Sequence, residues 1–196
     1  MRAKDENKAT VIREKAMEMI VSQGFDGLSM HKLAKAAGIS VSTIYIYFKN
    51  REDLLNQLYA ETAHIFVQTM LEGFSADMTF EEGLWQQWRN RYQHILRHPL
   101  HHRFWEQFRS SPLIEKQNDP CEQRFKQTMR DFVANAEEKK EIVKLPSEIF
   151  WAIAYGTFYT LIKFHLDNST MAGLPFTLND QLLKLTFDQV MKSLRI

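Results

Sequence analysis

The strongest constraint on the fold is the spacing of the apolar residues, which is helical along almost the whole chain. No alternating run of apolar and polar residues is flanked by hairpin turns, so the pattern does not indicate a sheet. Most of the few glycines and prolines lie at breaks between apolar stripes. The sequence therefore predicts an all-α fold of about nine helices, with a domain boundary soon after residue 50.

Length, cysteine content and hydropathy limit the class of protein. With 196 residues the chain has room for one domain or two small ones. Cys121 is the only cysteine, which excludes a disulfide framework and suits a reducing compartment. The N-terminus lacks the apolar core of a secretory signal. The longest uncharged stretch, residues 149–162, is shorter than the roughly 20 residues that span a membrane. We expect a cytoplasmic protein without a membrane segment.

The first fifty residues contain two short helix signals joined by a turn. Ser29 is placed to cap a helix over residues 30–37, which Gly38 ends. Ser40 is placed to cap a second short helix over residues 41–47. Two short helices joined by a brief turn that contains glycine predict a helix-turn-helix motif.

Positive charge is concentrated in the same part of the chain. The formal charge is +4 over residues 1–51 and −3 over the remainder, although the whole chain carries only +1. Within residues 27–51 every charged side chain is basic. A local basic face on a nearly neutral protein is typical of a module that contacts DNA.

The outward face of the helix over residues 41–47 carries small hydroxyl side chains and tyrosines. Small residues such as Ser42 and Thr43 allow a helix backbone to approach the floor of the major groove. Tyr45, Tyr47 and the lysine and arginine that follow them are long enough to reach phosphates on either side. We expect Asn50 to cap the next helix.

The stretch from Gly24 to Leu55 is similar to the N-terminal DNA-binding domain of the tetracycline-repressor (TetR) family. The elements that carry the resemblance are Gly24-Phe25, Leu33-Ala34, Ala37-Gly38-Ile39-Ser40 and the block Thr43-Ile44-Tyr45-x-Tyr47-Phe48, followed by Lys49, Arg51 and Leu54-Leu55. The resemblance implies a homodimeric regulator of transcription with two domains. Residues 1–50, with the motif at about 30–49, would bind operator DNA. Residues 51–196 would form a larger helical domain that binds an inducer and dimerises. By position, the DNA contacts implied are Ser29, Ser40, Ser42, Thr43, Tyr45, Tyr47, Lys49 and Arg51.

Two positions of the recognition helix depart from the family pattern. Ile46 stands where a polar or large aromatic residue is frequent, and Val41 stands where a basic residue is frequent. The helix therefore has no arginine or lysine of its own for bidentate contacts with guanine. We expect contacts with thymine methyl groups and recognition of DNA shape to matter more.

Two helices near the C-terminus have more apolar surface than one chain would cover. Residues 146–166 are apolar on nearly all sides, and residues 178–194 carry a broad apolar stripe. Packing against the same helices of a second copy would give a four-helix dimer interface. Burial within one chain is the alternative.

The C-terminal part is also rich in aromatic residues. An apolar cavity lined by rings would suit a flat or hydrophobic small molecule. The alternative is that the rings fill the core. The candidate pocket residues are Trp85, Trp88, Tyr92, Trp105, Phe108, Phe125, Trp151, Tyr155 and Phe158.

The residues that could support metal or catalytic chemistry form no complete site. The metal candidates are His94, His98, His101 and His102. Pro99 interrupts their helix, and no carboxylate cluster accompanies them, so we expect no metal site and no cofactor. Cys121 lacks an activating neighbour in the sequence. The chain has no phosphate-binding loop, nucleophile elbow or HExxH pair, so an enzyme is not expected.

The sequence thus predicts a ligand-responsive repressor that binds a palindromic operator as a homodimer and is released by a small hydrophobic molecule. Two recognition helices would enter successive major grooves about 34–36 Å apart. Two alternatives remain open. The chain is an all-helical small-molecule-binding protein or enzyme with a vestigial helix-turn-helix, or it is a constitutive regulator that has no inducer or recruits a protein.

Overall fold

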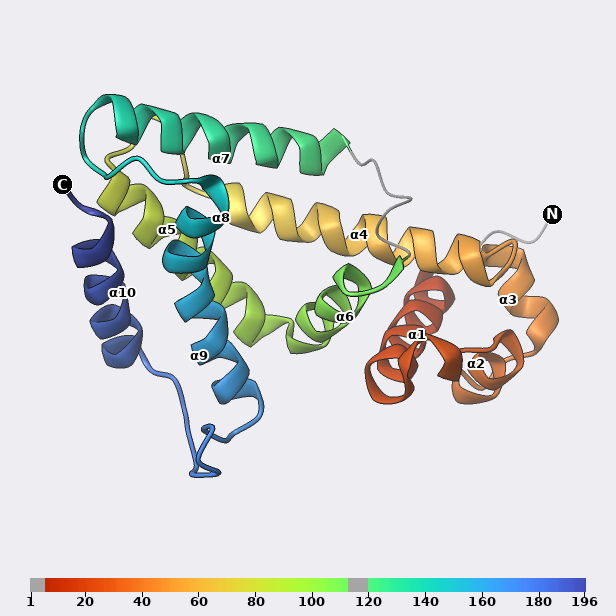
Figure 1. The fold of residues 1–196 in the computed structure, drawn as a ribbon. Coiled ribbons are helices and arrows are strands. Elements are labelled where there is room, and N and C mark those ends of the chain that lie inside the picture. The colour runs from red at the N-terminus through yellow and green to blue at the C-terminus, as the bar shows by residue number, and fades with distance from the viewer. Residues whose placement is uncertain (1–5, 113–119) are drawn as a thin grey trace. The chain divides into compact units, whose positions relative to one another are not determined.

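The computed structural model describes residues 6–112 and 120–196 (Figure 1). The regular structure in these ranges is entirely helical, and one isolated antiparallel bridge joins Ile142 to Arg195. The prediction of an all-α fold is confirmed. Across the described ranges, no helix has the length and hydropathy needed to cross a bilayer. The chain divides into two compact units, which we call unit 1 (Met1–Phe66 with Arg97–Glu122) and unit 2 (Val67–Leu96 with Gln123–Ile196).

Unit 1 is built from the N-terminal helices and one helix from the middle of the chain. Its elements are α1 (Glu6–Gly27), α2 (Met30–Ala36), α3 (Val41–Tyr47), the first part of α4 (Arg51–Leu71) and α6 (Pro99–Arg109). Ile12, Ala16 and Ile20 form the buried stripe of α1. The helix is kinked at Gly24, where φ is 71° and ψ is 177°, a conformation that glycine alone adopts without strain.

The core of unit 1 is closed by aromatic side chains of α6. Phe108 is fully buried and lies 4.5 Å from the Tyr59 ring and 5.9 Å from the Phe25 ring, measured between centroids. The Trp105 ring stacks on the Tyr59 ring at 5.2 Å between centroids. Aromatic side chains bury a large area each, so α6 contributes much of the apolar contact that holds unit 1 together.

Unit 2 packs helices of the middle and the C-terminal part of the chain around a second core. Its elements are the end of α4, most of α5 (Phe80–Arg97), α7 (Pro120–Glu138), α8 (Ser147–Trp151), a π-helical turn (Ala152–Gly156), α9 (Thr157–Leu166) and α10 (Asp180–Leu194). Trp88 is fully buried, and its indole N–H donates to the Ala154 carbonyl at 2.9 Å. The segment predicted as one helix over residues 146–166 is helical from Ser147 to Leu166, and it is wider at the π-helical turn.

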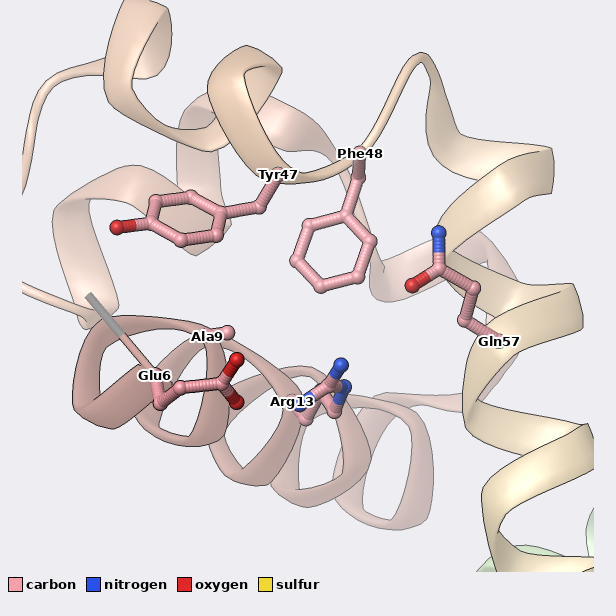
Figure 2. Close-up of a pocket in the computed structure, with 6 residues that line it drawn as sticks. All are labelled: Glu6, Ala9, Arg13, Tyr47, Phe48 and Gln57. Atoms are coloured by element: carbon pink, nitrogen blue, oxygen red, sulfur yellow. The ribbon is translucent and has the colours of Figure 1, made fainter. Parts of the chain in front are cut away.

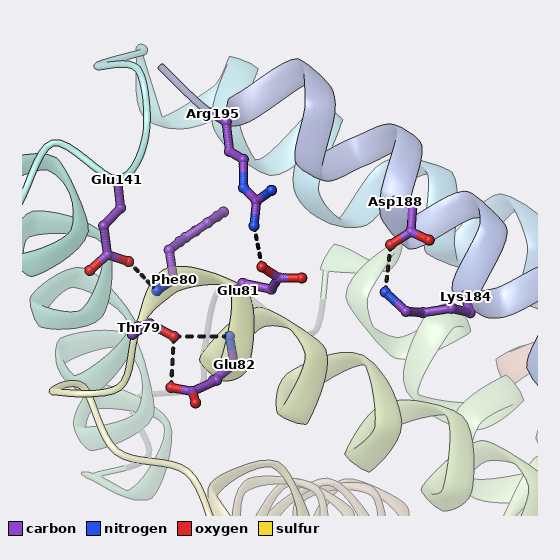
Figure 3. Close-up of polar contacts among 8 residues, drawn as sticks. All are labelled: Thr79, Phe80, Glu81, Glu82, Glu141, Lys184, Asp188 and Arg195. Carbon is purple, nitrogen blue, oxygen red and sulfur yellow. Dashed lines mark hydrogen bonds and ion pairs between the residues drawn. The ribbon is translucent and has the colours of Figure 1, made fainter.

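The N-terminus of α5 is tied to two other parts of unit 2 (Figure 3). The Glu141 carboxylate accepts a hydrogen bond from the Phe80 N–H, which is one of the amides that no intrahelical carbonyl can satisfy. Arg195, next to the C-terminus, forms an ion pair with Glu81. These contacts orient α5 within unit 2, and α5 carries several of the candidate pocket residues.

Candidate nucleic-acid interface and effector site

The two short helices of unit 1 are capped as the sequence predicts. The Ser29 hydroxyl accepts from the Lys32 N–H at 3.2 Å, and the Ser40 hydroxyl accepts from the Thr43 N–H at 3.1 Å. Between the helices Gly38 has a φ of 67°, in the left-handed region that glycine tolerates best. Local side-chain chemistry thus sets the start of both helices and the turn between them.

Burial of one face of α3 determines which side chains face solvent. Ile44 and Phe48 are almost fully buried in the core of unit 1. Because each residue advances about 100° around a helix, the opposite face is turned outward. Tyr45 and Ile46 are 51% and 55% exposed, and Ser42 is exposed beside them.

Three hydroxyl groups lie together at the N-terminal end of α3. The Ser40 Oγ is 2.8 Å from both the Ser42 Oγ and the Thr43 Oγ1. The group is small and polar, so a nucleic-acid strand could approach the backbone here without displacing large side chains. The structure therefore brings together three of the residues to which the sequence assigns DNA contacts.

Tyr47 occupies a different environment from Tyr45. It is half-buried and lines a pocket of about 180 Å³ together with Phe48, with α1 opposite and Gln57 of α4 at the side (Figure 2). On the α1 side, Arg13 lies over the Phe48 ring at 5.8 Å and forms an ion pair with Glu61 at 3.0 Å. The Tyr47 ring thus contributes to the wall of this pocket, and the Tyr45 ring is the more exposed of the two.

The segment between α3 and α4 is held by a reciprocal cap. The Asn50 side-chain oxygen accepts from the Asp53 N–H at 2.8 Å, and the Asp53 carboxylate accepts from the Lys49 N–H at 2.8 Å. The prediction that Asn50 caps α4 is confirmed. The Lys49 side chain is exposed, so its ammonium group is accessible to an anionic partner.

Arg51 is turned inward, which corrects its assignment to the DNA-contacting surface. Its Nε donates to the Leu28 carbonyl at 3.1 Å and its Nη2 to the Phe25 carbonyl at 2.5 Å. These carbonyls lie where α1 ends, beyond the regular hydrogen bonding of a helix. The guanidinium group therefore fastens the α1–α2 connection to the start of α4.

The capped α2–turn–α3 pair has the arrangement of a helix-turn-helix motif, with one face of α3 exposed. Residues 12–58 match the family model of bacterial regulatory proteins of the tetR family. This part of the chain is therefore similar to the tetR family of bacterial regulatory proteins, as the resemblance of the sequence indicated.

Curated relatives match over less than half of the chain. An uncharacterized HTH-type transcriptional regulator from Haemophilus influenzae is 35% identical over 81 residues, which cover 41% of this chain and 43% of the relative. The fatty acid metabolism regulator protein of Bacillus subtilis is 38% identical over 73 residues, which cover 37% of this chain and 38% of the relative. The chain thus matches less than half the length of these relatives.

Solved structures match over nearly the whole chain. A TetR family transcription regulator from Marinobacter aquaeolei has 23% identity and a TM-score of 0.76, with 99% of this chain and 98% of that chain covered. FadR from Bacillus subtilis, solved in complex with stearoyl-CoA, has 22% identity and a TM-score of 0.57, with 94% and 96% covered. At these identities the likeness establishes the fold that the chains share.

The nine aromatic residues proposed for a pocket do not form one group. Trp105 and Phe108 belong to the core of unit 1, beside Tyr59. The other seven lie in unit 2. The set is therefore corrected to seven, because the rings of α6 pack against α1 and α4 of unit 1. A stripe of rings on a helix does not reveal which core it joins.

Within unit 2 the seven rings differ in burial. Trp88 and Phe158 are fully buried and lie 5.2 Å apart, so they fill the core. The Tyr155 ring stacks on Trp151 at 4.6 Å, and Trp151 is itself partly exposed. This stacked pair lies at the start of the π-helical turn, where the helix is locally widened.

A buried polar stripe on α5 was missed by the sequence analysis. Its members are Gln87, Asn90, Arg91 and His94. Gln87 and Asn90 donate to the Met70 carbonyl at 2.6 and 3.2 Å, and so satisfy the C-terminal end of α4. Their spacing of three, four and seven residues places them on one helix face, which is the signal that could have found them.

Arg91 makes several contacts within unit 2. Its Nη1 donates to the Gln87 carbonyl at 3.1 Å and also to the Gln87 side-chain oxygen. Its Nε donates to the Tyr159 hydroxyl at 3.2 Å, and its guanidinium lies 4.5 Å over the Tyr155 ring. A guanidinium group fixed in this way presents a positive charge inside an aromatic environment.

The four histidines are divided between the units. His94 is buried in unit 2, whereas the other three lie in unit 1, where the His98 and His101 rings stack at 5.3 Å. Burial lowers the pKa of both His101 and His102. Among residues 6–112 and 120–196, no three histidine, cysteine or acidic side chains are arranged to hold a metal ion. Cys121 lies half-buried in the first turn of α7.

Proposed function

We propose that the protein is a ligand-responsive repressor of the cytoplasm that binds a palindromic operator as a homodimer and is released by a small hydrophobic effector. The observation that carries the proposal is the outward face of α3, where Ser42, Tyr45 and Ile46 are exposed, while Ile44 and Phe48 are buried on the opposite face. A recognition helix must present such a face to enter the major groove.

The side chains of this surface have distinct expected roles. Ser42 and Tyr45 project from α3 and are suited to base edges and phosphates, and the exposed Ile46 suits a thymine methyl group. Lys49 supplies a positive charge beyond the helix. The remaining proposed contacts with DNA are Ser29, Ser40, Thr43 and Tyr47.

Exposed apolar residues in unit 2 support the homodimer. Ile149 and Trp151 of α8 and Leu185 of α10 are 49%, 39% and 57% exposed. Large apolar side chains that are exposed on one chain are candidates for burial in an interface. They lie in the segments predicted to form a two-fold four-helix contact.

The effector is expected to be apolar because the candidate residues in unit 2 are all aromatic. FadR of similar fold was solved with stearoyl-CoA, and a relative that matches over 73 residues is a fatty acid metabolism regulator protein. These likenesses support a molecule with a long apolar chain as the class to test first. An effector would act only through its different affinity for the DNA-binding and non-binding conformations.

A gel-shift assay with the DNA upstream of the protein's own gene tests the proposal. We expect Lys49→Met to weaken binding and to lower the salt dependence of log K by about one for each bound protomer. Lys144→Met is the matched control, because Lys144 is an exposed lysine of unit 2 outside the helix-turn-helix.

Three results would contradict the proposal. If the protein shows no salt-sensitive DNA binding, the alternative of a small-molecule-binding protein or enzyme with a vestigial helix-turn-helix is favoured. Equal effects of the two lysine substitutions would remove the helix-turn-helix from the interface. DNA binding that no apolar ligand releases favours the constitutive regulator.

A further inference from the structure

Unit 1 contains a further small pocket, which is lined by residues of α1, α4 and α6. Its volume is about 140 Å³. The buried side chains of Met17 and Leu58 supply the apolar part of its lining. An apolar cavity of about 150 Å³ can hold benzene, so this pocket has room for a molecule of about six non-hydrogen atoms.

The charged side chains that line this pocket are not balanced. Arg13 forms the ion pair with Glu61 that is described above, and both residues line the pocket. Glu14 of α1 lines it as well, and it has no ion-pair partner among the residues that the structure describes. One positive and two negative side chains leave a carboxylate uncompensated, so the pocket favours a cation.

His101 of α6 provides a second, independent observation. Its ring lines the same pocket, and its buried Nδ1 atom has no hydrogen-bond partner in the part of the chain that the structure describes. A buried polar atom without a partner is costly and therefore rare in native proteins, so it points to a hydrogen-bonding group that binds here. Burial lowers the pKa of His101, and so does the neighbouring His98. The ring is uncharged at neutral pH, and it does not repel a cation.

From these features we propose that the pocket binds a small primary amine in its protonated form. An ammonium group carries three donors, which suit the Glu14 and Glu61 carboxylates and a neutral imidazole nitrogen of His101. Hydrogen bonds from an ammonium group to a carboxylate are charge-assisted. The alkyl chain lies against Met17 and Leu58. An anionic ligand would be repelled by the carboxylates, and a neutral alcohol would leave the charge of Glu14 unpaired.

The site belongs to the unit that carries the helix-turn-helix, and it does not depend on the effector proposed for unit 2. A ligand that binds only the folded form stabilises that form by mass action. Small amines would therefore act on unit 1 directly. They would change the affinity for DNA only as far as they bind the DNA-binding and non-binding conformations differently.

The test compares three ligands with the same number of carbon atoms, 1-aminopentane, 1-pentanol and pentanoate. Binding to the full chain is followed by amide NMR titration at neutral pH and constant ionic strength. We expect 1-aminopentane to bind about three- to tenfold more tightly than 1-pentanol, and pentanoate to bind more weakly than either. The largest changes in chemical shift should fall in α1, α4 and α6.

Glu14→Gln should lower the affinity for 1-aminopentane by about three- to tenfold and leave that for 1-pentanol unchanged. Glu14 is exposed, so this variant should keep its fold. The matched control is Glu18→Gln, because Glu18 is an exposed glutamate of the same helix that lies outside the pocket and pairs with Lys15. Both substitutions remove one negative charge, and only Glu14→Gln should change binding.

Four outcomes would overturn the proposal: equal affinity for 1-aminopentane and 1-pentanol, equal effects of the two glutamate substitutions, shifts centred outside α1, α4 and α6, or no binding of 1-aminopentane. Operator binding is measured in parallel by gel shift. Its absence would contradict the proposed repressor and not the amine site, whereas loss of the amine preference with intact operator binding would contradict only the site.

Discussion

Replacement of Arg51 by methionine tests whether this residue is structural. The substitution keeps an aliphatic side chain and removes both donors to the Phe25 and Leu28 carbonyls. A hydrogen bond from a charged donor contributes about 1.5–3 kcal/mol. Arg51 is half-buried, so water can replace part of what is lost. We therefore expect the free energy of unfolding of unit 1 to fall by about 2–4 kcal/mol.

The change should be visible in thermal unfolding followed by circular dichroism. In a chain of this length about 1 kcal/mol shifts Tm by roughly 2–4 °C. Because two compact units can unfold separately, amide hydrogen exchange of the α1–α2 connection gives a second measurement that is specific to unit 1. Faster exchange there is expected for Arg51→Met.

Lys49→Met is the control for this experiment, since its exposed side chain should change stability by no more than about 0.5 kcal/mol. The reasoning is refuted if Arg51→Met unfolds at the wild-type temperature and weakens DNA binding with the same loss of salt dependence as Lys49→Met. That result would indicate that Arg51 contacts a DNA phosphate, as the sequence resemblance implied.

Further substitutions probe the turn, the histidines and the proposed interface. Gly38→Ala should cost about 1–2 kcal/mol of folding free energy from the left-handed backbone alone, because the added Cβ meets no neighbour; denaturant unfolding measures this. His101 and His102 have folded pKa values below 6.5, so the unfolded chain binds more protons just below pH 6.5, and Tm should fall as the pH drops from 7.5 to 5.5. Replacing both with glutamine should flatten this dependence, and an unchanged slope would contradict the assignment. Leu185→Glu should give a monomer in sedimentation experiments, and a dimer of wild-type affinity would exclude α10 from the interface.

Local features of the helix-turn-helix could be read directly from the sequence. Ser29, Ser40 and Asn50 each cap a helix through a partner three residues away, and Gly38 supplies a conformation that a side chain would oppose. Interactions of such short range depend little on the rest of the fold. The all-α class and the motif were therefore predictable from residue type and spacing.

Positions of long-range partners were not predictable in this way. The donors of Arg51 reach carbonyls 23 and 26 residues away, and nothing in its neighbouring residues distinguishes it from the exposed Lys49. The rings of Trp105 and Phe108 follow a pattern as apolar as that of Trp88, yet they join a different core.

The sequence alone determined where helices start and stop and which short segment is suited to contact DNA, because these properties depend on neighbours within one or two turns. Tertiary structure decided that Arg51 faces inward, that α6 completes unit 1, and that Arg91 lies buried over the Tyr155 ring. Burial arises only when segments distant in the chain exclude water together, and the same arginine is a surface cation or a buried one according to that packing.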